Sequence, residues 1–78
     1  MVLENLDLRK AVIHNIHDMN KQELRDMVVD SIEQHEEKLL PGLGVVFEVI
    51  WENSNADFRD QMIATLHDNL PEKAEKPL

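Results

Sequence analysis

The sequence predicts an all-α protein, a small bundle of about four short helices around a central apolar helix at residues 41–53. Apolar side chains recur at helical spacing through most of the chain, and capping signals stand before two of the helical stretches. A chain of 78 residues is long enough for one domain with a small core. We therefore expect a single helical domain at residues 1–70 and a disordered polar tail at residues 71–78.

The first helix is expected at about residues 6–18. Leu8, Val12 and Ile16 follow one another at intervals of four, so they share one face, and Lys10 lies on the opposite face. This pattern is typical of an amphipathic helix that rests on a core.

The second helix is expected at about residues 21–35. Asn20 followed by Glu23 has the spacing of a capping box, in which each residue binds the backbone N–H of the other. The apolar face is formed by Leu24, Met27, Val28 and Ile32. The outer face carries the acids Asp26, Asp30, Glu33 and Glu37. We interpret this acidic stripe as a solvated face, because a site for a hard cation usually gathers six or more oxygen ligands from a loop.

The central helix follows Pro41, whose fixed φ suits a first helical turn. Its apolar residues cover an arc of roughly 240°, far wider than the stripe of a surface helix. We therefore expect other elements to cover it on several sides. A strand is the competing interpretation of residues 45–50, which have strong β propensity, but no second run in the chain could pair with it.

The fourth helix is expected at about residues 56–68. Ser54, with Asp57 three residues later, has the spacing of a second capping box. The apolar face repeats every four residues through Phe58, Met62, Leu66 and Leu70, with Ile63 beside it. Pro71 ends the pattern, and the residues after it are polar.

The charge balance excludes several classes of partner. Sixteen acidic and eight basic residues give a net charge of −8, with no basic patch. Proteins that bind nucleic acids draw much of their affinity from Lys and Arg on phosphates, so direct DNA or RNA binding is disfavoured.

No apolar run approaches the ~20 residues that span a bilayer, and the N-terminus lacks the apolar run of a signal peptide. We expect a soluble cytoplasmic protein without a membrane partner, and the absence of cysteine fits a reducing compartment.

The sequence offers no convincing site for chemistry. His14 and His17 could share a metal ion, yet no third ligand stands at a suitable spacing. Gly42 and Gly44 resemble part of a dinucleotide-binding turn, but no strand precedes them. Glu48 could have a raised pKa if buried, although its place on a polar strip with a second glutamate favours a solvated carboxylate. We therefore predict no catalytic residue, metal, cofactor or small-molecule substrate.

The central helix is instead the candidate protein interface. Trp51 is either a plug in the core or the centre of an interface, and the sequence leaves both interpretations open. Three short amphipathic helices are not expected to cover the central helix completely, which favours self-association or another protein as partner. The residues of this candidate interface are Leu43, Val45, Glu48, Val49, Trp51 and Glu52.

The residues also resemble a known family. The segments that carry the resemblance are residues 6–13, 29–32 and 36–51, together with Met62, Thr65 and Leu66. They are similar to the small acid-soluble spore protein I family of endospore-forming bacteria, and the similarity covers about residues 6–70. The chain departs from the family pattern in a longer tail and at His14, His17 and His35, where small or polar residues are expected, with glycine frequent at the last.

The resemblance implies a function without a mechanism. It implies a non-enzymatic minor protein of the spore core, expressed in the forespore during sporulation. It provides no established catalytic or binding residue that could be transferred to this chain. The abundant DNA-coating spore proteins are a different group, and their DNA affinity is not implied here. The alternative hypothesis is a helical adaptor that binds a partner protein through the surface around Val45, Glu48 and Trp51.

Overall fold

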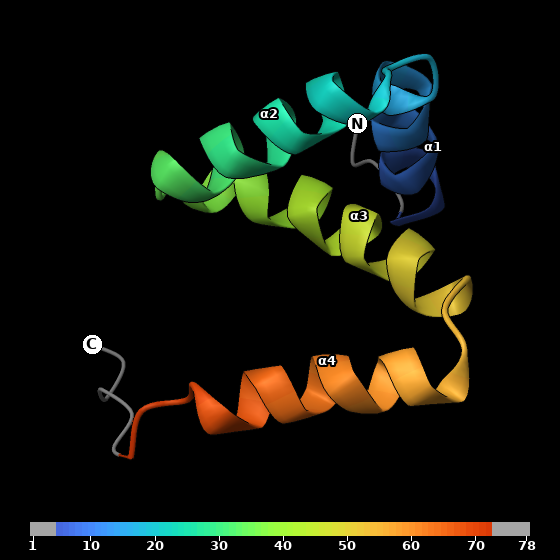
Figure 1. Cartoon of the computed structure of the whole chain (residues 1–78). Helices are drawn as coiled ribbons and strands as arrows, with labels where there is room; N and C mark the ends of the chain where they lie inside the picture. Colours follow the sequence, from blue (N-terminus) through green and yellow to red (C-terminus); the bar gives the residue numbers. More distant parts are fainter. Residues whose placement is uncertain (1–4, 73–78) are drawn as a thin grey trace.

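The computed structural model describes residues 5–72, and every regular element within them is helical. The all-α class predicted from the sequence is therefore confirmed. Figure 1 shows the helices in chain order. Their bounds are α1 Asn5–Ile16, α2 Lys21–Glu33, the short 3-10 helix η1 Glu37–Leu39, α3 Leu40–Glu52 and α4 Ala56–Asp68. The division into domain and tail stays a prediction, and residues 73–78 of the predicted tail lie outside the described part.

Helix α2 begins at the capping box that the sequence predicts. The side-chain oxygen of Asn20 accepts a hydrogen bond from the backbone N–H of Glu23 at 2.8 Å. The Glu23 carboxylate accepts one from the backbone N–H of Asn20 at 3.1 Å. Backbone donors that lack a helical partner at a helix start are thereby satisfied locally.

Helix α2 ends two residues earlier than expected, because the backbone turns at His35. The φ of His35 is 51°, in the left-handed region, where a side chain with a Cβ costs roughly 1–2 kcal/mol. Gln34 is the C-cap, so His35 occupies the next position, at which glycine is preferred. The glycine expected at this position from the family resemblance thus has a conformational reason.

Helices α1 and α3 form the main tertiary contact of the fold. Val45 of α3 is 7% exposed and is the only buried side chain among residues 8–72. Leu8 of α1 lines the same contact. Beside it Arg9 and Glu48 form a two-pronged ion pair, with Nε to Oε2 and Nη2 to Oε1 both at 2.9 Å. Two parallel hydrogen bonds fix the orientation of the partners, so this pair aligns α1 on α3.

Helix α4 has the predicted bounds, but its cap is one residue later than predicted. The side-chain oxygen of Asn55 accepts a hydrogen bond from the backbone N–H of Phe58 at 2.8 Å. The hydroxyl of Ser54 instead donates to the carbonyl oxygen of Ile50 at 2.6 Å. The predicted capping box of Ser54 and Asp57 is therefore wrong, because Ser54 still belongs to the turn that ends α3.

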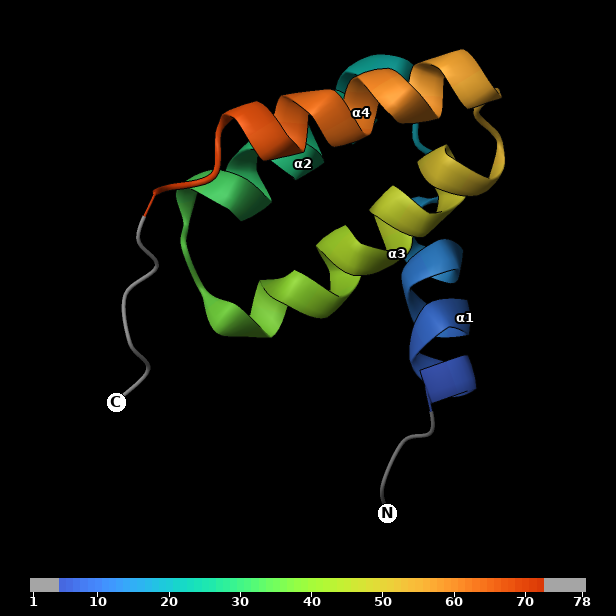
Figure 2. The ribbon, with the colours of Figure 1, turned by 90° about the horizontal axis from the view of Figure 1, so that it is seen from below.

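Helix α4 runs back from the corner at residues 53–55 without closing on α3, as Figures 1 and 2 show. Phe47, Val49 and Ile50 of α3 consequently remain 44–48% exposed. The expectation that the central helix is covered on several sides is met only in part, because α1, α2 and η1 lie against one part of its surface and the side toward α4 is open. The fold is open on the side between α3 and α4.

Candidate functional site

An open apolar groove of about 360 Å³ lies between α3 and α4. The six residues that line it, here called the α3–α4 groove, are Phe47, Glu48, Trp51, Glu52, Ile63 and Leu66. Four of them are large apolar side chains. Phe47, Ile63 and Leu66 are 48%, 48% and 57% exposed. An apolar surface that gathers residues from two helices in this way makes the groove the candidate functional site.

Trp51, the only tryptophan of the chain, is half-buried in the wall of the groove. Its ring centroid is 5.8 Å from that of Phe47, and the two rings are tilted by 35°. The guanidinium carbon of Arg59 lies 5.3 Å from the indole centroid, within the range of a cation–π contact. Trp51 therefore packs partly within its own chain and leaves the rest of its ring open to the groove.

Arg59 connects the start of α4 to the end of α3. Its Nε donates to the carbonyl oxygen of Trp51 at 2.8 Å, and its Nη2 donates to that of Glu52 at 3.4 Å. The last carbonyls of a helix lack partners within the helix, so the guanidinium supplies a donor to two of them; the Trp51 carbonyl oxygen also accepts from the backbone N–H of Ser54 at 3.2 Å. The side-chain amide of Asn53 also donates to the carbonyl oxygen of Val49 at 2.8 Å. These bonds hold the corner at residues 53–55 and with it the opening of the groove.

The structure distributes the six predicted interface residues over different sides of α3. Those that line the groove are Glu48, Trp51 and Glu52. Val45 is buried against α1, so it is a core residue and is no part of an accessible surface. Leu43 lies at the α2 side of α3, and Val49 is exposed outside the groove. The interface itself stays a prediction.

Four residues of the groove or the corner were not among the predicted interface residues, namely Phe47, Ile63, Leu66 and Arg59. Phe47 and Trp51 are four residues apart, and Ile63 and Leu66 are three apart, so each pair shares a helix face. That spacing was a usable signal. Arg59 gave no such signal, because nothing in a sequence indicates that an arginine reaches a carbonyl eight residues earlier.

Arg9 sets the charge state of Glu48. The hydrogen bond from Arg9 holds the pKa of the Glu48 carboxyl below its ordinary value; partial burial opposes this shift, and the charge of Arg9 adds to it. The same hydrogen bond raises the pKa of Arg9. The raised pKa considered for Glu48 from its sequence position is therefore wrong, and Glu48 is an ionised partner of Arg9 at neutral pH.

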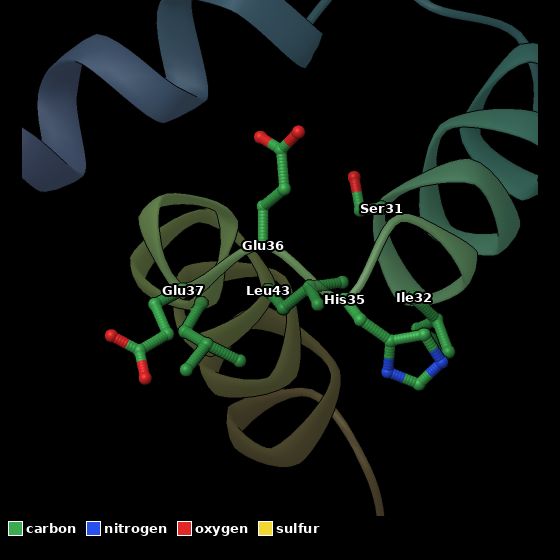
Figure 3. Close-up of a pocket in the computed structure, with 7 residues that line it drawn as sticks. Ser31, Ile32, His35, Glu36, Glu37 and Leu43 are labelled. Atoms are coloured by element: carbon green, nitrogen blue, oxygen red, sulfur yellow. The ribbon is translucent and has the colours of Figure 1, made fainter.

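A second hollow, of about 260 Å³, lies where α2 meets the start of α3 (Figure 3). Its lining is formed by Ser31, Ile32, His35, Glu36, Glu37, Leu40 and Leu43. Figure 3 shows the ring of His35 beside Ile32, whereas the carboxylates of Glu36 and Glu37 point in different directions. Glu36 pairs instead with Lys38 at 3.2 Å. The hydrogen bonds found within residues 5–72 do not join His35 to Ser31, so these residues do not form an assembled nucleophile and base.

The predicted histidine pair is brought together by α1 and the turn that follows it. The rings of His14 and His17 are stacked with centroids 5.8 Å apart, and Nδ1 of His17 lies 2.8 Å from the carbonyl oxygen of His14. Across the described residues, no group of three or more His, Cys, Asp or Glu side chains is placed to hold a metal ion. Within the same range, no helix is both long enough and apolar enough to cross a membrane.

Comparison with known proteins identifies relatives over almost the whole chain. The family described as "Small, acid-soluble spore protein I" matches residues 6–70. A protein of that name from Geobacillus sp. (strain WCH70) is 46% identical over 70 residues, which cover 90% of this chain and 99% of the relative. The Bacillus subtilis (strain 168) protein of that name is 46% identical over 66 residues, 85% of this chain and 93% of the relative. No solved structure matches the chain.

Proposed function

The chain belongs to the small, acid-soluble spore protein I family, and we propose that it serves in the spore core as a non-enzymatic protein that acts through protein contacts. Its relatives are named as spore proteins, so it is a spore protein. The finer points, expression in the forespore and residence in the core, belong to the proposal. The observation that carries it is the α3–α4 groove, an exposed apolar surface on a chain with almost no core of its own.

The charge of the chain supports protein rather than nucleic acid as the partner. A net charge of −8 repels the phosphate backbone. The cations near the groove are already engaged, because Arg9 is paired with Glu48 and Arg59 binds backbone carbonyls. We therefore propose no contact with DNA, RNA, a membrane surface or a small-molecule substrate.

The function is tested by an immunoblot of acid extracts from growing cells, sporulating cells and purified spores of the source organism. The expected result is a band that appears in the forespore and persists in spores after the coat layers are removed. A band of equal strength in growing cells would separate the function from sporulation. A band lost with the coat would place the protein outside the core.

The second candidate is a helical adaptor that binds a different protein through the same groove. It is favoured by the apolar ring of Trp51, which Arg59 orients at the wall of the groove. Since Val45 is buried, the adaptor surface consists of the groove residues alone. Cross-linking in forespore lysate should then trap one dominant heterologous protein, and substitution of Leu66 by glutamate should abolish that product. Trapping of this chain alone would contradict the adaptor.

A further inference from the structure

We propose that the α3–α4 groove receives a second copy of this chain, with α4 of each copy lying in the groove of the other. This inference rests on the proposed function, in which the groove is a protein-binding surface, and it names the occupant.

The groove is available to an occupant from outside the chain, because α4 and α3 are joined only at the corner. Arg59 spans the corner with hydrogen bonds to two α3 carbonyls. The bonds of Asn55 and Ser54 lie within the start of α4 and the end of α3, respectively. Beyond the corner, Phe47, Ile63 and Leu66 are 48–57% exposed, so the groove is open in the single chain.

Helix α4 carries the apolar stripe that such a groove accepts. The exposed large apolar side chains of this stripe are Phe58 at 52%, Ile63 at 48%, Leu66 at 57% and, just after the helix, Leu70 at 58%. The most extensive helix contacts of the described residues do not include α4, so this stripe lacks cover. A two-fold arrangement covers both surfaces at once, because each α4 enters the partner's groove while its own groove is filled. The result is a four-helix arrangement of two α3 and two α4 helices.

The exposed apolar surface is concentrated on the two helices of the groove. Of the eleven large apolar side chains that are exposed among the described residues, eight lie on α3, on α4 or just after α4. An apolar surface that two helices share in this way is the kind that a pair of identical chains buries on association.

The charges near the groove allow two acidic chains to meet there. Of the two carboxylates in the groove, that of Glu48 is neutralised by Arg9 of the same chain. The remaining net charge of −8 acts between copies mainly at long range, where salt screens it. Added salt should therefore strengthen association between copies. A basic partner would show the opposite dependence.

The test begins with the full-length chain. Sedimentation equilibrium over a roughly hundredfold range of micromolar concentration should show monomer converting to dimer. The emission of Trp51 should shift to shorter wavelength along the same concentration curve, because the single tryptophan lies in the groove. Both curves should move to lower concentration when the salt concentration is raised.

Two variants locate the interface. Leu66→Glu places a charge in the groove and should weaken dimerisation roughly 100-fold, because each dimer loses two buried leucines. Val29→Glu is the matched control, since Val29 is 47% exposed on α2 and does not line the groove. It adds the same charge and should dimerise like the unaltered chain. Helix content by circular dichroism should be equal in both variants, because both replaced side chains are exposed.

A cross-link tests the arrangement without relying on a disruptive variant. The chain contains no cysteine, so Ile63→Cys introduces a single thiol near the middle of α4, close to the two-fold axis of the proposed pair. Oxidation should give a covalent dimer at concentrations at which Val29→Cys, which still pairs through the groove, gives no covalent dimer. Equal cross-linking of both variants would overturn the arrangement.

The remaining outcomes each overturn the second copy as occupant. A monomer whose Trp51 emission is blue-shifted at every concentration would mean that α4 closes on its own chain. A monomer with solvent-exposed Trp51 throughout would leave the groove to a heterologous protein. Either result is independent of the spore immunoblot, so failure of the dimer and failure of the proposed function are distinguished.

Discussion

Helix α3 packs closely against α1 and faces an open groove on the side of α4. On the α1 side, Val45 is buried, and Arg9 and Glu48 close the edge with a pair of hydrogen bonds. On the α4 side, Phe47 and Trp51 face an open groove, and the polar bonds lie at the corner rather than along the helices. The Arg9–Glu48 ion pair thus joins α1 and α3 along their contact, whereas the Arg59 hydrogen bonds join α3 and α4 only at the corner.

The difference explains how so short a chain has a defined but incomplete fold. The α1–α3 contact joins residues 39 positions apart, so it fixes the chain as a unit. The α3–α4 connection involves near neighbours in the sequence and leaves the apolar stripe of α4 uncovered. Stability of the single chain therefore depends on the closed side, and the association proposed above would use the open side.

The largest effect is expected from a charge on the closed side. Val45→Asp places a carboxylate in the one buried position and should lower the free energy of unfolding by about 3 kcal/mol or abolish folding. Val49→Asp is the matched control, because Val49 lies one turn later and is 44% exposed; its cost should stay within about 1 kcal/mol. Urea unfolding followed by circular dichroism measures both. Equal losses would mean that the two positions do not differ in burial.

A smaller effect is expected at the start of α4. Asn55→Ala removes the side-chain oxygen that binds the Phe58 N–H and should cost about 1 kcal/mol. Ser54→Ala leaves that cap in place and should cost less, which distinguishes the observed cap from the one predicted from sequence. Helix content and urea unfolding report both changes. A greater loss for Ser54→Ala would restore the predicted capping box.

A gain in stability, about as large as the loss expected for Asn55→Ala or slightly smaller, is expected from a substitution at His35. Because its φ of 51° favours glycine, His35→Gly should stabilise the chain by roughly 0.5–1 kcal/mol. His14→Gly serves as the control of opposite sign: His14 lies within α1, where replacing histidine by glycine should cost about 0.5 kcal/mol. Thermal unfolding measures both variants. Destabilisation by His35→Gly would contradict the left-handed conformation.

The smallest effect is expected from the ion pair on the closed side, and it depends on pH. Since the Arg9 hydrogen bond lowers the folded pKa of Glu48, its stabilisation is complete above the ordinary glutamate value of 4.5. It is lost as the pH falls through the lower folded value. The free energy of unfolding of the Glu48→Gln variant should therefore fall less on acidification than that of the unaltered chain. Glu52→Gln, one turn away, should keep the pH profile of the unaltered chain; identical profiles for both variants would contradict the role of the pair.

Local sequence patterns predicted much of the fold. The bonds of Asn20 and Glu23 lie within three residues, so a capping box is readable from the chain alone. The bounds of α4 followed from its repeat of four. Ser54 and Asn55 are both good cap residues and adjacent, and only the turn that ends α3 decides between them. Local pattern therefore gives the helices and leaves their ends uncertain by a residue or two.

The arrangement of the helices and the groove could not be predicted in the same way. The pairing of Arg9 with Glu48 crosses 39 residues, and neither residue has a neighbour that signals it. The apolar arc of α3 contains several valines, and only packing against α1 selects Val45 as the buried one. The opening of the groove depends on Arg59, whose reach to Trp51 and Glu52 is a tertiary event.

Amide hydrogen exchange of the unaltered chain at two protein concentrations tests the contrast between the two sides of α3 most directly. At low concentration the amides of α4 should exchange faster than those of α1 and α3, because α1 and α3 form the main helix contact and α4 takes no part in it. At high concentration the protection of α4 and of residues 47–52 should rise, while that of α1 should stay constant. Protection of α4 that does not change with concentration would contradict an open side that a second copy covers.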